Sequence, residues 1–272
     1  FYLFDSKDQI PIEIKEKPVE LAKPEAVDVP GCWETQGYDR PQYLNILYPF
    51  PVDPPYIPRE NPTAVYQKKF AVPESWSEQE IQITFLGVSS AFELFLNGQF
   101  IGAGKGSHMT SEFSLTPYLD IKHENLLTVF VYKWCDGAYL EDQDMWRMHG
   151  IFRDVYLSAR PTLHIQNVQI QTDYDPVTSE GILELSFSTN NQNILPLKIT
   201  LRSTSGELIT LREVNSDEKV SETFKEINLW TAETPNLYQL IIETLDDKIN
   251  TLEVVGFYIG FRRIKIVDQQ LL

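Results

Sequence analysis

The sequence predicts an all-β protein built from two antiparallel sandwiches. Short stretches rich in β-branched and aromatic residues recur along the chain and are separated by turn residues. None of these stretches has the spacing of an amphipathic helix. The 272 residues exceed what one ordinary small domain needs and suit two packed domains, each with its own core.

The first series of strands is expected between residues 64 and 157. Its clearest signal is the pair Asn97 and Gly98, which favours a two-residue hairpin that turns Gln99–Ile101 back antiparallel. Short strands of this spacing, joined by turns, indicate a sandwich of jelly-roll type. The expected strands are Val65–Val72, Ile81–Leu86, Phe92–Leu96, Ser111–Leu115, Leu126–Tyr132 and Ile151–Leu157.

Residues 1–30 are interpreted as an arm that belongs to the first sandwich. The arm contains an apolar patch at Phe1–Phe4, an alternating stretch at Ile10–Ile14 and a run rich in lysine, glutamate and proline. Such a run is not typical of regular structure. Val27–Trp33 is expected to form a short strand that a Pro-Gly pair interrupts.

A second domain is expected to begin at about Pro161, because this proline interrupts the strand pattern and a new series starts at Leu163. Several strands within about a hundred residues match the size of an immunoglobulin-like sandwich. The predicted domains are therefore a jelly roll at 1–160 and an immunoglobulin-like sandwich at 161–266. The strands expected in the second domain are Leu163–Ile170, Ile182–Phe187, Leu197–Leu201, Leu208–Leu211, Leu237–Ile242 and Leu252–Val255.

Charge and cysteine usage exclude several classes of function. The 23 basic and 39 acidic residues give a formal charge of −16, which repels phosphate backbones and anionic membranes. Neither nucleic acid nor a membrane is therefore an expected partner. Cys32 and Cys135 lie far apart without Cys-x-x-Cys spacing, and the four histidines are scattered, so no disulfide framework or zinc site is indicated. The compartment stays open between cytoplasm and periplasm.

One loop carries three carboxylates, those of Glu141, Asp142 and Asp144, next to Arg147 and Arg153. Retaining glycoside hydrolysis needs two carboxyl groups about 5 Å apart, one of them a proton donor. Carboxylates that share a short loop with arginines are better suited to ion pairs than to proton donation. On the residues alone, an ion-paired loop is the first interpretation. Nucleophile-elbow, phosphate-loop and zinc-protease motifs are absent from the sequence.

Several short motifs follow one another in a fixed order along nearly the whole chain. They are Gln36–Asp39, Tyr43–Pro49, Asn61–Thr63, Gly87–Phe92, Asn97-Gly98, Ser111–Phe113, Tyr139–Arg147, Leu229–Tyr238 and Gly260–Ile264. The first seven resemble the sugar-binding jelly roll of bacterial β-galactosidases of glycoside hydrolase family two. The last two resemble the closing strands of the immunoglobulin-like domain of the same family.

The resemblance implies a third domain, a (β/α) barrel that supplies both catalytic glutamates and the magnesium ligands. Residues 267–272 resemble the start of the link to that barrel. This chain is then expected to be a non-catalytic two-domain piece that holds no catalytic residue and has its own barrel as a partner. The complete enzyme is expected to hydrolyse terminal β-D-galactose from β-galactosides by the retaining route.

The resemblance also assigns substrate contacts. Asn45 matches an asparagine whose amide reaches galactose hydroxyls, and Ile46 matches the apolar residue beside it. Asp144 matches a carboxylate that hydrogen-bonds galactose and binds sodium together with barrel groups. Sodium and magnesium are thus expected in the full-length enzyme, and neither is expected to bind tightly to this chain. The resemblance leaves a homo-oligomer open. The segment 205–224 is shorter here than the long loop through which the larger enzymes reach a neighbouring subunit's active site, so the same tetramer is not expected.

Two other interpretations remain open from the sequence. Jelly-roll and immunoglobulin-like sandwiches also serve as stand-alone carbohydrate-binding or adhesion modules. A family-two hydrolase of another sugar, such as a glucuronide, is a further alternative. The run Asp-Gln-Asp-Met-Trp-Arg at 142–147 favours the β-galactosidase. For Asn45, the alternative to a sugar contact is a turn-capping amide.

Overall fold

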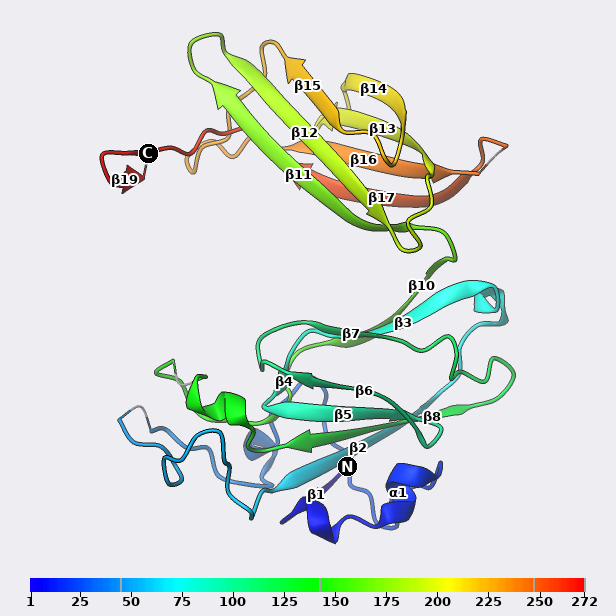
Figure 1. The fold of residues 1–272 in the computed structure, drawn as a ribbon, viewed down its shortest axis with the longest axis vertical. Helices are drawn as coiled ribbons and strands as arrows, with labels where there is room; N and C mark the ends of the chain where they lie inside the picture. The colour runs from blue at the N-terminus through cyan, green and yellow to red at the C-terminus, as the bar shows by residue number, and fades with distance from the viewer. Residues whose placement is uncertain (45, 142, 247, 272) are drawn as a thin grey trace. The chain divides into compact units, whose positions relative to one another are not determined.

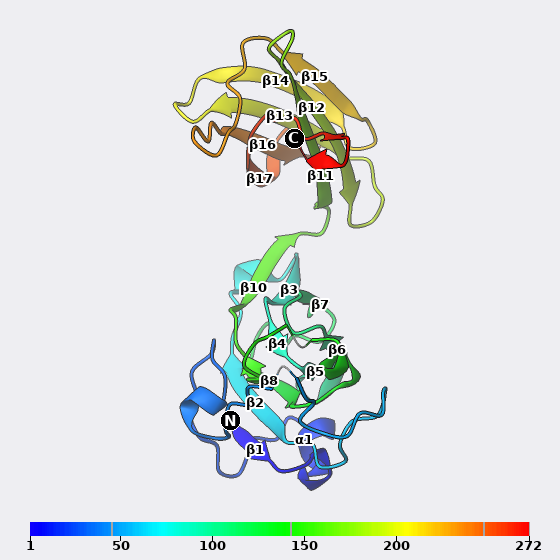
Figure 2. The same cartoon turned by 90° about the vertical axis from the view of Figure 1, so that its left-hand side faces the viewer.

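The computed structural model of the chain describes residues 1–44, 46–141, 143–246 and 248–271. Its regular secondary structure is mostly antiparallel β-sheet, so the all-β prediction is confirmed. The chain divides into two compact units, Phe1–Ala159 and Arg160–Leu272 (Figures 1 and 2). Within the described residues, no helix is long and apolar enough to cross a membrane.

The first unit contains a five-stranded sheet with the order β1-β2-β8-β5-β6 and a three-stranded sheet with the order β10-β3-β7. A short pair, β4 with β9, lies beside them. The bounds are β1 (Tyr2–Phe4), β2 (Thr63–Phe70), β3 (Gln79–Phe85), β4 (Val88–Ser89), β5 (Ala91–Leu96), β6 (Gln99–Lys105), β7 (Ser111–Ser114), β8 (Asn125–Tyr132), β9 (Gly150–Ile151) and β10 (Val155–Pro161). Short helical turns are η1 (Lys7–Gln9), α1 (Ile12–Glu16), η2 (Glu34–Gln36), η3 (Glu74–Trp76) and η4 (Asp136–Tyr139).

The predicted hairpin joins β5 to β6, with Leu96 opposite Gln99. Asn97 and Gly98 both have positive φ, 53° and 78°, as a two-residue turn of this kind requires. The Asn97 amide also donates to the Tyr118 carbonyl at 3.2 Å. The hairpin is therefore determined locally by the Asn-Gly pair and then fixed to the rest of the unit.

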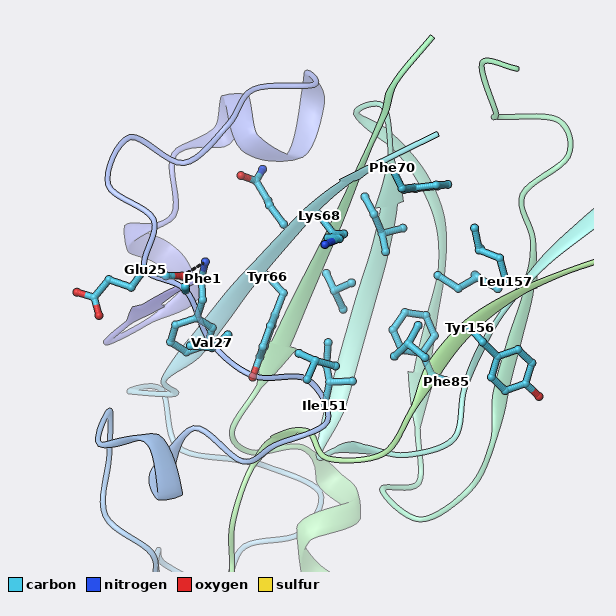
Figure 3. A pocket seen from close by; sticks show the side chains of 17 residues that line it. Phe1, Glu25, Val27, Tyr66, Lys68, Phe70, Phe85, Ile151, Tyr156 and Leu157 are labelled. Carbon is cyan, nitrogen blue, oxygen red and sulfur yellow. Dashed lines mark hydrogen bonds between the residues drawn. The ribbon is translucent and has the colours of Figure 1, made fainter. Parts of the chain in front are cut away.

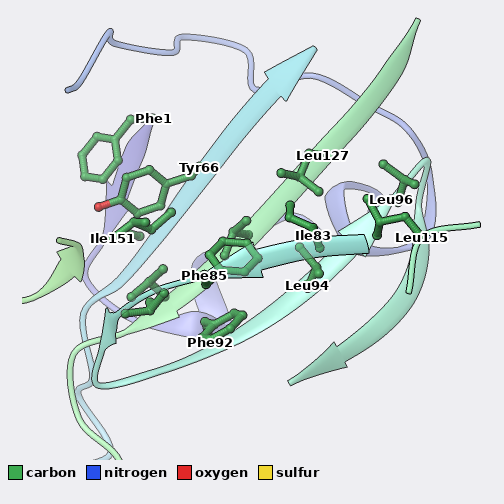
Figure 4. Close-up of a cluster of buried hydrophobic side chains, with 14 of the residues drawn as sticks. Phe1, Tyr66, Ile83, Phe85, Phe92, Leu94, Leu96, Leu115, Leu127 and Ile151 are labelled. Carbon is green, nitrogen blue, oxygen red and sulfur yellow. The ribbon is translucent and has the colours of Figure 1, made fainter. Parts of the chain in front are cut away.

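The core of the first unit lies between its two main sheets. Figure 4 shows side chains of β3, such as Ile83 and Phe85, together with Phe92 and Leu94 of β5. Alternation along each strand sends every second side chain inward, and the rings of Phe85 and Phe92 meet at 4.9 Å. Full burial of such a side chain stabilises the fold by about 1.5–3 kcal/mol.

The arm covers the outer face of the five-stranded sheet, where Ile10, Ile14 and Leu21 pack against Val65 and Phe130. The stretch Ile10–Ile14 does not continue as a strand, because α1 begins at Ile12. Ile10 lies in extended backbone before this helix and Ile14 lies within it, and both side chains are buried.

Val27–Trp33 also departs from the expectation of a strand, since it belongs to no sheet. It makes isolated backbone hydrogen bonds to residues in and beside β9. The Gly31 N–H donates to the Ile151 carbonyl at 2.8 Å, and the Trp33 N–H donates to the His149 carbonyl at 3.0 Å. The segment is fixed by the fully buried Trp33 ring instead of by a ladder.

The second unit has the sheets β11-β12-β15 and β14-β13-β16-β17, with a small pair β18-β19. Its core lies between the two larger sheets and includes Leu183, Leu197 and Leu240. These sheets agree with the predicted immunoglobulin-like sandwich. The bounds are β11 (Ile165–Asp175), β12 (Glu180–Thr189), β13 (Pro196–Ser203), β14 (Leu208–Asn215), β15 (Val220–Phe224), β16 (Tyr238–Leu245), β17 (Thr251–Ile259), β18 (Ile266–Val267) and β19 (Gln270–Leu271).

A buried pair in the first unit ties η2 to the segment before β9. The Glu34 carboxylate accepts from the His149 backbone N–H at 2.8 Å and lies 2.7 Å from His149 Nδ1. Both side chains are almost fully buried, and the imidazole is enclosed by Trp33 and Trp134 at ring distances of 5.6 and 5.0 Å. Burial lowers the pKa of His149, although the neighbouring Glu34 partly opposes this shift.

Because burial lowers the pKa of His149, the free energy of unfolding depends on pH. The folded protein keeps His149 neutral, whereas the unfolded chain binds a proton below a pH of about 6.5. We therefore expect the free energy of unfolding to be fully retained above that pH and to decrease as the pH falls below it. Denaturant unfolding at several pH values between about 5.5 and 7.5 measures this dependence.

His149→Gln removes the titrating group and should reduce the slope of stability against pH, besides lowering stability itself. His123→Gln is the matched control, because the His123 side chain is 77% exposed. Equal slopes for the wild type and His149→Gln would show that the buried imidazole does not cause the pH dependence.

Candidate functional site

Two loops of the first unit, residues 42–48 and 143–147, carry the residues expected to face a sugar. An antiparallel bridge joins them: the Arg147 N–H donates to the Gln42 carbonyl at 2.6 Å, and the Gln42 N–H donates to the Arg147 carbonyl at 3.4 Å. The Tyr48 hydroxyl adds a bond to the Tyr139 carbonyl at 2.8 Å. Segments far apart in the sequence are therefore held side by side.

Asp144 lies at the centre of this arrangement. Its backbone has a φ of 55°, in the left-handed region that aspartate tolerates better than most residues. The Tyr43 hydroxyl donates to its carboxylate Oδ1. The Tyr43 ring also lies 5.6 Å from the ring of Trp146, two residues after Asp144. The carboxylate is thus exposed yet held by a side chain from the other loop.

The other two predicted contact residues lie on the 42–48 loop. Ile46 is 89% exposed. Asn45 lies outside the described residues, as does Asp142 of the acidic run. The structure therefore joins the loop that bears Ile46 to the carboxylate of Asp144, which the sequence motif alone could not establish.

Tyr43 and Ser107 are the site residues that sequence reasoning missed. Tyr43 stands inside the motif Tyr43–Pro49, but its bond to Asp144 spans 101 positions and no local pattern signals it. Ser107 holds the neighbouring carboxylate of Glu141, donating from its backbone N–H at 2.9 Å and from Oγ at 2.7 Å. Hydroxyl–carboxylate hydrogen bonds thus hold both Glu141 and Asp144 of this loop.

A pocket of about 430 Å³ opens beside Asp144. Its wall mixes the hydroxyls of Ser89 and Ser107, the carboxylate of Glu141 and the rings of Trp134 and Trp146. Hydroxyl and carboxylate groups beside aromatic faces suit a polyhydroxylated ligand, and the volume lies within the range of small-molecule sites. The arrangement can bind and orient a ligand.

A second pocket, of about 590 Å³, lies elsewhere in the first unit. Figure 3 shows its largely apolar wall, which includes Phe1, Tyr66, Phe85, Ile151 and Leu157. Phe1, Tyr66, Phe85 and Ile151 also belong to the main core, so the pocket is an opening onto that core. Neither Ile46 nor Asp144 lines it.

Among the described residues, no group of three or more His, Cys, Asp or Glu side chains could hold a metal ion. Sodium and magnesium prefer oxygen ligands, and Asp144 presents a carboxylate of that kind. A carboxylate of this kind can serve as one ligand of a cation site. Both cysteines, Cys32 and Cys135, are free thiols.

Comparison with known sequences gives consistent matches. A β-galactosidase of Alteromonas mediterranea is 36% identical over 290 residues, covering 100% of this chain and 28% of the relative. One of Photobacterium profundum is 37% identical over 285 residues, with coverage of 100% and 28%. One of Oenococcus oeni is 38% identical over 262 residues, with coverage of 91% and 25%. The chain thus spans about a quarter of the length of these relatives.

Solved structures with the same fold include a β-glucuronidase from Ruminococcus gnavus in complex with D-glucaro-d-lactam. It has a TM-score of 0.74 and 16% identity, and the match covers 93% of this chain and 42% of that one. A β-glycosidase from Bacteroides vulgatus gives a TM-score of 0.66 at 24% identity, covering 75% and 26%. At these identities the likeness supports the fold alone.

The family itself follows from two matches that together span nearly the whole sequence. Residues 1–161 match the sugar binding domain of glycosyl hydrolases family 2, and residues 163–262 match a further domain of glycosyl hydrolases family 2. The resemblance inferred from the sequence motifs is confirmed. With a sugar-binding jelly roll followed by an immunoglobulin-like sandwich, the chain belongs to glycosyl hydrolases family 2.

Proposed function

We propose that this chain is the non-catalytic N-terminal part of a β-galactosidase and supplies one wall of the galactose site. Hydrolysis of terminal β-D-galactose, with retention, takes place in a catalytic barrel outside this chain. The observation that carries the proposal is whole-chain similarity, at 36–37% identity, to relatives named β-galactosidase. In the site, Asp144 and Ile46 contact the sugar, together with Asn45.

The exposed surface around the two loops supports the role of a wall. Large apolar side chains are left in solvent there: Ile46 is 89% exposed, Leu47 70%, Leu140 84% and Trp146 58%. Such a concentration of exposed apolar surface is typical of a face that meets a ligand or another protein surface. The complementary wall is then the barrel, and the sugar is enclosed only when both walls are present.

Each ion has a separate proposed place. Sodium binds at Asp144 together with barrel oxygens, where it supplies a fixed positive charge toward a sugar hydroxyl. Magnesium is held by the barrel alone.

The alternatives are less well supported. A stand-alone carbohydrate-binding module is less favoured, because relatives that match along the whole of this chain are named β-galactosidase. The similar glucuronidase structures are 16% identical to this chain, and at that identity the likeness supports the fold and not the substrate. We therefore propose galactosides as the substrate class.

The isolated 272-residue chain should not cleave galactosides, because both catalytic carboxylates lie in the barrel. We expect its turnover of a chromogenic β-galactoside to equal that of the Asp144→Asn chain and of buffer. Circular dichroism checks that the tested chain is folded. Turnover above the buffer rate, lost in a variant of the chain, would place the chemistry here instead.

Binding to the isolated chain should also be weak. Half of a pocket leaves most of the ligand solvated, so it provides little free energy against the entropic cost of association. We expect calorimetry to detect no galactose binding at micromolar concentrations. Micromolar affinity would support the stand-alone module.

In the complete enzyme, Asp144→Asn should keep the fold and lower kcat/KM. The change preserves shape but removes the charge that strengthens a hydrogen bond to a sugar hydroxyl and attracts sodium. Loss of a charge-assisted bond costs about 1.5–3 kcal/mol, which corresponds to roughly a 10- to 150-fold decrease. Steady-state kinetics over a range of sodium concentrations provide the measurement.

Asp136→Asn is the matched control, because this carboxylate pairs on the surface with Lys105 at 2.8 Å. Exposed pairs of this kind contribute little to stability. We expect near wild-type kinetics for Asp136→Asn. If Asp144→Asn leaves both kcat/KM and sodium dependence unchanged, Asp144 is not part of the galactose site.

A further inference from the structure

The contact between Tyr43 and Asp144 is more specific than the general pairing of the two loops requires. Gln42 and Arg147 already tie the loops through two backbone hydrogen bonds. Tyr43 adds a bond from its hydroxyl to the one carboxylate that the proposed sugar site uses. The bond therefore acts on the direction of a functional side chain.

An exposed aspartate needs such support. On a loop in solvent its side chain can occupy several rotamers, and all but one of them are lost when a ligand binds. Asp144 also has a left-handed backbone conformation, which sets the direction in which its side chain leaves the loop. A donor that holds the carboxylate in one orientation before binding reduces the entropic cost of binding.

The donor itself is well placed. The bridge partner Gln42 immediately precedes Tyr43, so the backbone of Tyr43 is anchored next to the other loop. Its ring is 47% exposed and packs against Trp146, which limits ring motion on the side of the 143–147 loop. The hydroxyl is thus directed by contacts at both the backbone and the ring.

We propose that Tyr43 is a positioning residue for Asp144: its hydroxyl fixes the carboxylate in the orientation that receives galactose and its accompanying cation. This inference rests on the proposed function, because Asp144 must be a sugar contact for its orientation to matter. Tyr43 acts through Asp144 and not directly on the reacting bond.

The test is Tyr43→Phe in the complete enzyme, which removes one oxygen and keeps the ring against Trp146. We expect galactose affinity, measured by calorimetry at fixed sodium, to fall roughly 10-fold, because a hydrogen bond to a charged group is lost. The sodium concentration that gives half-maximal galactose affinity should rise. This binding measurement does not depend on turnover.

Tyr48→Phe is the matched control. It removes the same atom from the same loop, but the Tyr48 hydroxyl donates to the backbone carbonyl of Tyr139. Both variants should lower the unfolding temperature by similar amounts, since each loses one hydrogen bond. Only Tyr43→Phe should change the affinity for galactose and the dependence on sodium. Equal effects of the two variants would reduce Tyr43 to a structural tie between loops.

A double-mutant cycle separates this inference from the proposed function. If Tyr43 acts through Asp144, then Tyr43→Phe should change affinity less than about 2-fold in an Asp144→Asn background. If the roughly 10-fold loss persists in that background, Tyr43 acts independently and the positioning role is wrong. If Asp144→Asn alone changes nothing, the proposed sugar site fails instead, whatever Tyr43→Phe does.

Discussion

The carboxylate of Glu34 is fully removed from water, and this burial constrains the whole site end of the first unit. A buried charge persists only where hydrogen bonds compensate its lost hydration. Here the compensation comes from the backbone N–H and the imidazole of His149, 115 positions away. The turn η2 and the segment leading to β9 are therefore fixed to each other. The bridge between Gln42 and Arg147 continues the same connection outward, toward Asp144.

Most of the fold could be predicted because a strand with one buried face alternates apolar and polar residues in the sequence. Alternation along β3 and β5, and the Asn97-Gly98 turn, each reflect a contact local to the strand or hairpin. The arm was harder to predict. Ile10 lies in extended backbone and Ile14 in the short helix α1, yet both pack against Val65 and Phe130. This tertiary packing leaves no local period in the sequence.

The candidate site also has a part that the sequence could predict and a part that it could not. A motif could indicate Asp144 and Ile46, because a resemblance transfers residue identities along the chain. It could not indicate what holds them. Tyr43 reaches Asp144 across 101 positions, and Ser107 reaches Glu141 across 34. Neither separation matches a helical or strand period, so the sequence could not predict these two contacts. They follow from the tertiary structure, which brings the loops together.

The division between a rigid scaffold and an exposed wall has a physical consequence for function. The loops present Ile46 and Trp146 to solvent but restrain Asp144 through a side chain and a backbone bridge. Apolar contacts are non-directional and gain their free energy whenever a complementary surface arrives. A carboxylate contributes to selectivity only if its oxygens point correctly, because hydrogen bonds weaken steeply with misalignment. Restraint is therefore most useful at Asp144, whereas Ile46 and Trp146 can remain unrestrained by hydrogen bonds without loss of their contribution.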